Sequence, residues 1–293
     1  MPIAVIAAAL VAVIVWGASP VASKIAVAEL PPPAVALLRT VLGGLAALPL
    51  ALLLRIPFPS GWRQRAVLLL SAFGGFIAFP MLFTAGIART SANHASMILA
   101  SLPIFTGAIA MAWDRRRPGR RWWLGCAVAL GGAAVLIGGR QAAGAGEAGL
   151  LGDLLVLAAN GFAASGYVAG GRLQREGYPS TGTTFWGAAV AAALLLPAAP
   201  FVLAGIAPDS IGVSAWAGVA YLALGVTVLG YVAWYWALGH GGIARVGLFQ
   251  FLQPVSGLLL AGLLLGEALS LSLLLAAAMI LAGVWLAMRD RGA

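Results

Sequence analysis

The sequence places amides and a proline inside a long apolar stretch, where polar groups are costly and usually functional. Gln250 and Gln253 lie three residues apart, so they share one face if the stretch is a helix. Gln253 directly precedes Pro254, which has no backbone N–H and leaves one carbonyl without its helical partner. Such groups can hold the polar atoms of a small molecule, or can join neighbouring helices. We predict both glutamines as substrate-binding residues and leave the packing role open.

Aromatic residues recur at helical spacing in two other apolar stretches. Tyr231 precedes Trp234 by three residues, and Phe79 precedes Phe83 by four. Phe83 and Trp234 are separated by 151 residues. Aromatic faces can bind a flat apolar group by stacking or a cation by its charge, although such stripes also serve simple packing. The predicted aromatic substrate-binding residues are Trp16, Phe79, Phe83, Tyr167, Tyr231 and Trp234, of which Trp16 and Tyr167 also differ by 151.

Few titratable residues lie inside the apolar stretches. His94 follows Asn93 near the start of one stretch, where it can couple to protons or hydrogen-bond at a cavity mouth, and we predict it as substrate-binding. Lys24 can meet a carboxylate, but a lysine near a helix end more often extends to the membrane interface. Arg39 is the deepest charge, and we expect its guanidinium to pair with backbone carbonyls.

Every acid lies at or near the end of an apolar stretch, where a proton relay through the membrane would not place it. This distribution favours uniport, or coupling through a group other than a carboxylate. The acids are Glu29, Asp114, Glu147, Asp153, Glu176, Asp209, Glu267 and Asp290.

The motifs of most enzyme classes are missing from the sequence. It contains no Walker-type phosphate loop, nucleophile elbow or metal-ligand cluster, and the single cysteine, Cys126, cannot form an intramolecular disulfide. We therefore predict no cofactor, no metal and no catalytic residue. A membrane-embedded enzyme or scaffold is the weakest alternative, because it would need acids, histidines or cysteines clustered at one depth.

The elements that carry these residues are predicted to be transmembrane helices. Hydrophobic residues make up 62% of the 293 residues, charged residues only 9%, and the mean hydropathy is +1.02. A soluble domain carries about 25% charged residues, so most of these side chains must face lipid or one another. The ten apolar stretches cover roughly 3–22, 33–54, 66–86, 93–113, 122–138, 150–170, 183–204, 213–238, 243–265 and 270–288. We expect the first to remain as a helix, because no basic segment precedes it as in a cleaved signal.

The basic residues predict the orientation. With ten helices, one side of the membrane collects 13 of the 17 basic residues, the other side three, and Arg39 lies within a helix. Positive charge accumulates on the cytoplasmic side, so both termini are predicted to be cytoplasmic. The same arginines lie in short gaps between apolar stretches rather than in a basic patch, which disfavours a nucleic-acid partner.

The sequence repeats itself at an offset of 151 residues. This offset pairs Gly74 with Gly225 and Pro103 with Pro254, without a gap. Each repeat would hold five helices, an odd number, so the second must be inverted relative to the first. We predict an all-α membrane protein with an inverted five-helix repeat at 1–142 and another at 143–293. Inverted repeats are the architecture of alternating-access transporters, with the substrate site between the halves.

The residues Trp16-Gly17-Ala18-Ser19-Pro20 and Leu252-Gln253-Pro254-Val255 through Gly266-Glu267 resemble the EamA-type branch of the drug/metabolite transporters. The segment Gly86-Ile87-Ala88-Arg89-Thr90 is similar to the YddG-like exporters of aromatic and other amino acids. The resemblance implies a multi-pass exporter in the bacterial inner membrane. One departure is that the position equivalent to Glu267 is Arg116.

Together, these features predict a secondary transporter that exports aromatic and other neutral amino acids, with the lipid bilayer and a small-molecule substrate as its partners. Efflux of drugs or other metabolites is the alternative. Ser19, beside the Trp16 segment, is predicted to bind substrate, and three prolines are predicted hinges: Pro20, Pro103 and Pro254. Oligomeric state and the exact substrate are left open.

Overall fold

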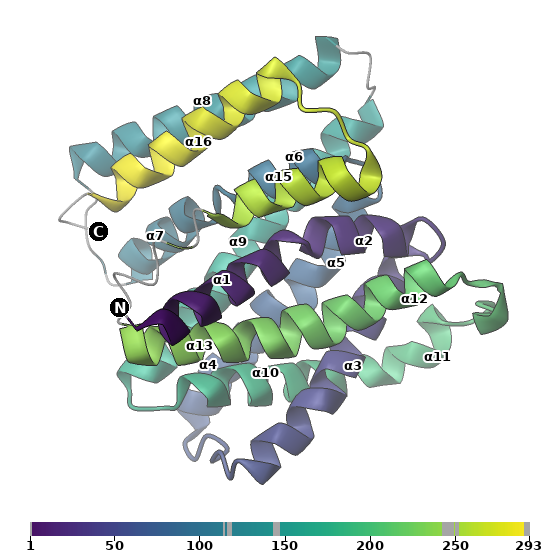
Figure 1. Cartoon of the computed structure of the whole chain (residues 1–293). Helices are drawn as coiled ribbons and strands as arrows, with labels where there is room; N and C mark the ends of the chain where they lie inside the picture. Colours follow the sequence, from purple (N-terminus) through teal and green to yellow (C-terminus); the bar gives the residue numbers. More distant parts are fainter. Residues whose placement is uncertain are drawn as a thin grey trace.

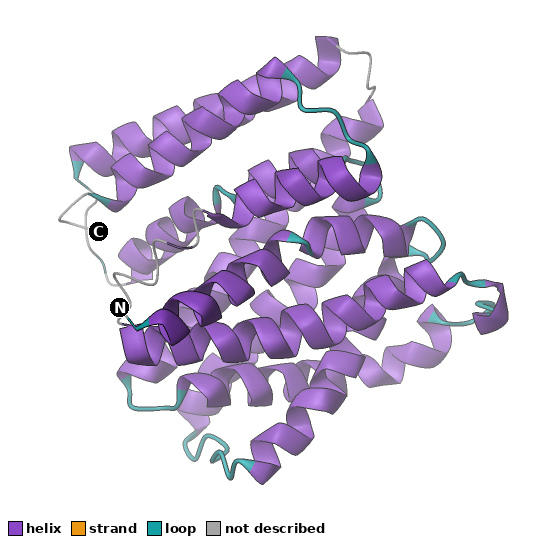
Figure 2. Cartoon of the chain, viewed as in Figure 1, coloured by secondary structure: helices purple, strands orange, loops and turns teal. Residues whose placement is uncertain are grey.

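A computed structural model describes residues 2–113, 115, 119–142, 147–241, 249 and 252–289. Within these ranges the regular structure is helical, and no strand is formed (Figure 2). The first helix begins and the last helix ends at the same side of the molecule (Figure 1). Seven helical stretches of the described chain are long and apolar enough to cross a membrane, and two shorter apolar helices follow them. The chain is therefore a multi-pass membrane protein.

The helices of the N-terminal half follow the predicted apolar stretches closely. The first stretch is divided at Ala18, just before the Ser19-Pro20 pair, because proline is accommodated in the first turn of a new helix. The fourth is divided near Ala100. The helices are α1 (Ile3–Gly17), α2 (Ser19–Val27), α3 (Pro32–Leu53), α4 (Trp62–Ala72), α5 (Phe79–Ile87), α6 (Ala92–Leu99), α7 (Leu102–Trp113) and α8 (Arg120–Ala142).

The C-terminal half begins with an unbroken helix of 29 residues. Its helices are α9 (Glu147–Arg175), α10 (Ser180–Leu195), α11 (Ala199–Val202), α12 (Val213–Ala220), α13 (Tyr231–Gly241), α15 (Leu252–Leu265) and α16 (Leu271–Met288). Short 3₁₀ segments cover Leu196–Ala198 and Pro208–Ser210.

Two π-helical segments interrupt the longest composite helices. Phe73–Ala78, called η1, joins α4 to α5, and Tyr221–Gly230, called η4, joins α12 to α13. A π-helix bonds each N–H to the carbonyl five residues back and is often found at functional sites. Shifting η1 by 151 residues places it inside η4. The same offset separates the starts of α4 and α12, each preceded by an extended glycine, and the starts of α8 and α16.

Small residues allow helices of the two halves to pack closely. α8 lies along α16 (Figure 1). A side chain at Gly125 would lie 2.4 Å from the carbonyl oxygen of Gly283, and one at Gly132 would lie 3.0 Å from that of Ala276. As the chain advances along α8, its partners on α16 move backwards, so the two helices are antiparallel. Close backbone approach of this kind provides van der Waals contact where lipid offers little hydrophobic driving force.

In the interior, the first helix of each half packs against helices of the other half. α9 of the second half packs against α4, η1 and α5 of the first, whereas α1 packs against η4 and α13. Glycines again permit the contact, because a side chain at Gly74 would lie 2.6 Å from the carbonyl oxygen of Phe162 on α9. Both π-helical segments border one shared cavity, η1 through Phe76 and η4 through Thr227.

Candidate substrate site

An aromatic cluster forms where α1 meets α13. The Trp16 ring lies 5.1 Å from the Tyr231 ring and 5.4 Å from the Trp234 ring, centroid to centroid. Trp16 and Trp234 are both buried. Gly230 makes room for the indole, because a side chain there would lie 2.5 Å from Trp16 Nε1. The structure therefore brings together three of the predicted aromatic residues, with Trp16 more than two hundred positions from Tyr231 and Trp234 in the sequence.

A cavity lies beside this cluster, between α3, η1, α5, α9, η4 and α13. The space not filled by atoms is about 370 Å³ when the open solvent at its mouth is counted. The Tyr167 hydroxyl on α9 lies 3.4 Å from the Tyr231 hydroxyl on α13, and the Phe76 ring lies 6.0 Å from the Tyr231 ring. The lining residues are Arg39, Thr40, Gly75, Phe76, Phe79, Pro80, Ala163, Tyr167, Thr227 and Tyr231. Three of the predicted residues, Phe79, Tyr167 and Tyr231, thus line one cavity.

Arg39 brings a positive charge to this aromatic cavity. Only 6% of its surface is exposed, and its Nη1 atom is buried without a hydrogen-bond partner. Its Cζ atom lies 5.7 Å from the centroid of the Phe79 ring, close enough for a cation–π contact. The expected pairing with backbone carbonyls does not form at Nη1. The sequence signal was the arginine's depth in its helix, but only the fold shows that it faces a cavity.

Both π-helical segments are hydrogen-bonded from outside at the edge of the site. Thr40 Oγ1 donates to the carbonyl oxygen of Phe76 in η1 at 2.8 Å, and Trp16 Nε1 donates to that of Val226 in η4 at 3.2 Å. Unpaired backbone groups are expensive inside a membrane, so these side chains stabilise the irregular backbone.

Phe83 has a supporting position. Its ring stacks on Phe79 with centroids 5.4 Å apart and planes inclined by 21°, and the side chain is fully buried. It belongs to the hydrophobic cluster of α5, α6 and α9 rather than to the cavity lining. Phe83 therefore fixes the orientation of Phe79, which touches the cavity.

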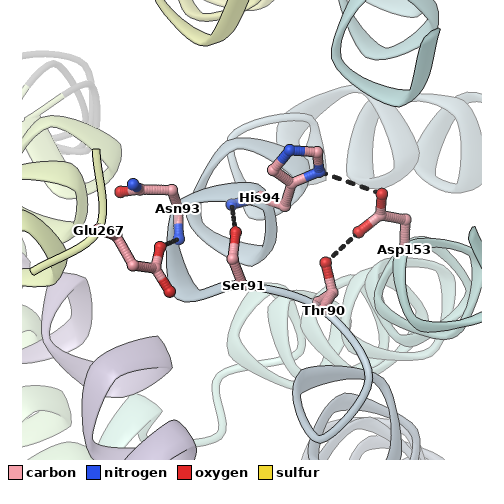
Figure 3. A network of polar contacts seen from close by, with 6 residues as sticks. All are labelled: Thr90, Ser91, Asn93, His94, Asp153 and Glu267. Atoms are coloured by element: carbon pink, nitrogen blue, oxygen red, sulfur yellow. Dashed lines mark hydrogen bonds and ion pairs between the residues drawn. The ribbon is translucent and has the colours of Figure 1, made fainter. Parts of the chain in front are cut away.

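A separate polar network surrounds the start of α6 (Figure 3). His94 Nδ1 lies 3.1 Å from Asp153 Oδ2, and the other Asp153 oxygen accepts a hydrogen bond from Thr90. Asp153 is only 1% exposed. His94 is thus engaged with an acid of the other half, outside the cavity lining. The acid lies near a helix end, as the sequence indicated, but it is buried, so acid positions alone do not exclude proton coupling.

Two further charged side chains, Glu267 and Lys24, cap helix ends close to the start of α6. The Glu267 carboxylate accepts hydrogen bonds from the backbone N–H groups of Ala92 and Asn93, at 2.8 Å each. Negative charge at a helix N-terminus is stabilised by the free N–H groups there. Lys24 Nζ donates to the carbonyl oxygens of Ile87, at 3.0 Å, and Thr90, at 2.6 Å, instead of extending towards lipid headgroups. α2, α5, α6, α9 and the end of α15 are thereby tied together.

The other predicted site residues lie away from the cavity or outside the described residues. Ser19 and Pro20 are buried at the start of α2, and Pro254 is buried in α15. The Gln253 carbonyl accepts a hydrogen bond from Ser256 at 2.8 Å. Gln250 lies outside the described residues, and for Pro103 the structure describes the backbone of α7 but not the side chain.

Comparison with known proteins agrees with this architecture. The model of the EamA-like transporter family matches residues 3–138 and 150–289. The chain is 32% identical over 260 residues to the uncharacterized transporter YdeK of Bacillus subtilis, covering 88% of this chain and 87% of that protein. It is 29% identical to the probable amino-acid metabolite efflux pumps of Salmonella typhimurium and Escherichia coli, covering 95% of this chain and 92% of each.

One solved crystal structure shares the fold, with a TM-score of 0.65 at 20% identity and 98% coverage of both chains. The family model covers most of the sequence in two successive matches, one for each half. The predicted resemblance is confirmed: this chain belongs to the EamA-like transporter family and is a membrane transporter.

Proposed function

We propose that the protein exports aromatic and other neutral amino acids across the bacterial inner membrane by alternating access, as a secondary transporter and not as an enzyme. The observation that carries the proposal is the aromatic cavity between the two halves. Its lining comes from helices of both repeats, so relative motion of the halves would expose it first to one side and then to the other. Apolar and aromatic side chains are the groups that such a lining binds well.

The repeats are proposed to comprise residues 1–142 and 143–293, five helices each, with the second inverted and both termini cytoplasmic. Contacts between α8 and α16 support this symmetry. The 151-residue offset converts Gly132 into Gly283 and relates Gly125 to Ala276, so it exchanges the two close contacts described above. Such an exchange is the mark of a twofold axis. Because the helices are antiparallel, that axis is perpendicular to them, as inversion requires.

The amino-acid assignment is further supported by the two efflux pumps to which the chain is similar. Efflux of drugs or other metabolites is the alternative substrate class, because aromatic linings also bind lipophilic compounds. Uniport is the proposed mode of coupling, and the buried Asp153 beside His94 makes a direct test of it necessary.

Uptake of radiolabelled phenylalanine, tryptophan and leucine into proteoliposomes tests the proposal, with and without an imposed pH gradient. We expect saturable uptake that the gradient does not alter. Trp16→Ala should lower it strongly, whereas Trp123→Ala is the matched control, because Trp123 is exposed on α8.

Uptake that depends on the gradient would replace uniport by proton coupling. If no amino acid is taken up while lipophilic drugs are, the amino-acid assignment is wrong and the efflux alternative holds.

A further inference from the structure

Arg39 carries a charge that the described protein does not neutralise. No acidic residue lines its cavity, and Nη1 has no hydrogen-bond partner. An unpaired charge inside a protein is strongly unfavourable, and buried charges are normally paired or bound to a ligand. The ring of Phe79 offers only a weak attraction at 5.7 Å. The missing partner is therefore expected to be an anion that enters the cavity.

The chemistry of the guanidinium defines that anion further. Its planar fork of N–H donors matches a carboxylate, which it binds through two parallel charge-assisted hydrogen bonds. The surrounding wall is aromatic, formed by Phe76, Phe79, Tyr167 and Tyr231. A ligand that satisfies both features has one carboxylate and an apolar or aromatic remainder.

Among the described residues that line the cavity, none is acidic. An acid would be needed to hold the ammonium group of an amino acid by an ion pair, and these residues provide only ring faces, hydroxyls and backbone for it. The carboxylate is thus recognised strongly and the amine weakly.

We propose that Arg39 is the carboxylate-binding residue of the transport site, so that the protein selects aromatic and apolar monocarboxylates and does not require an α-amino group. The inference rests on the proposed function for the location of the site, but it extends the substrate class to deaminated acids. It also predicts that aromatic amines, although cationic and flat, are excluded by the guanidinium.

Isothermal titration calorimetry of ligand binding to the purified full chain in nanodiscs tests this inference. Four probes differ only in their polar groups: phenylalanine, 3-phenylpropionate without the amine, 2-phenylethylamine without the carboxylate, and phenylalaninamide without the negative charge. We expect the two carboxylates to bind with similar affinity, and the amine and the amide at least about tenfold more weakly, as loss of a hydrogen bond between charged groups implies.

Substitutions then assign the effect to one side chain. Arg39→Gln should weaken both carboxylates by at least about tenfold and leave the amine unchanged, and Arg39→Lys should give an intermediate loss, since lysine keeps the charge but not the fork. Arg89→Gln is the matched control, because Arg89 Nη1 donates to the carbonyl oxygen of Ala85, four residues earlier, and Arg89 is not part of the cavity lining. The wild-type comparison of the four probes does not depend on whether Arg39→Gln folds.

The outcomes separate this inference from the proposed function. If the amine or the amide binds as tightly as the acids, or if a folded Arg39→Gln variant binds the acids normally, the role of Arg39 is refuted while amino-acid transport stands. If 3-phenylpropionate binds and phenylalanine does not, the role of Arg39 is supported and the amino-acid assignment fails. If none of the four probes binds, both are refuted.

Discussion

Replacing Glu267 should open the end of the molecule at which α6 begins. Glu267 lies in the loop that follows α15. Its carboxylate accepts two hydrogen bonds of 2.8 Å from backbone N–H groups at the start of α6. Hydrogen bonds to a charged acceptor contribute about 1.5–3 kcal/mol each, but water can replace part of this at a half-buried site. We therefore expect Glu267→Ala to destabilise the arrangement seen in the structure by about 2–3 kcal/mol. This corresponds to about a 30- to 150-fold larger open population, in which the contact between this loop and α6 is broken.

A thiol-accessibility assay measures this population. In a Cys126→Ala background, which removes the single cysteine, Ser96→Cys introduces a reporter on the buried face of α6. Its rate of reaction with a membrane-impermeant maleimide should rise in proportion to the open population when Glu267→Ala is added. Glu267→Gln should lie between the two, because an amide keeps one acceptor oxygen without the charge. Unchanged labelling in a variant that keeps its melting temperature would refute the capping argument.

Three further predictions concern other contacts. Asp153→Asn should weaken the attachment of α9 to α6 and alter the pH dependence of transport more than its maximum rate, and identical pH profiles for variant and wild type would exclude a role in coupling. Gly283→Leu should lower the melting temperature by several degrees, because even a methyl group there would lie 2.5 Å from the α8 backbone, whereas Gly161→Ala, with open space around it, should not. Burial raises the pKa of Tyr178 to about 12, while its hydroxyl donates to the Pro57 carbonyl at 2.9 Å. The folded pKa of Tyr178 exceeds the unfolded value of about 10. The stability that the protonated hydroxyl contributes is therefore complete below about pH 10 and is lost as the pH rises from about 10 to about 12. Melting curves of Tyr178→Phe should lack that alkaline step.

Much of the helical pattern was predictable because lipid leaves the backbone few alternatives to helix. The predicted stretches coincide with most of the observed helices to within a few residues. The division at Ala18 is a local effect of Ser19-Pro20 and is also visible in the sequence. The π-helical segments were not predicted, because a register of five instead of four residues leaves no clear signature in a run of apolar residues.

The candidate site was predictable in part. Helical spacing and the repeat identified Trp16, Tyr167 and Tyr231, which the structure places around one interior. The position of Arg39 in the cavity lining was missed, since sequence position gives the depth of a charge but not its direction. The His94–Asp153 pair was also missed, because the two residues come from different halves and meet only through the packing of α6 on α9.

The two π-helical segments have a mechanical consequence. A π-helical turn holds one residue more than an α-helical turn, so removing that residue from the turn would rotate the rest of the helix by about 100° and shift it by about 1.5 Å. Phe76 in η1 and Thr227 in η4 both border the cavity at such a turn. Each segment is therefore a point at which rotation of the helix is coupled to a shift along its axis. A change of winding there would exchange the side chains presented to the interior and move the part of the helix beyond the turn by that rotation and shift.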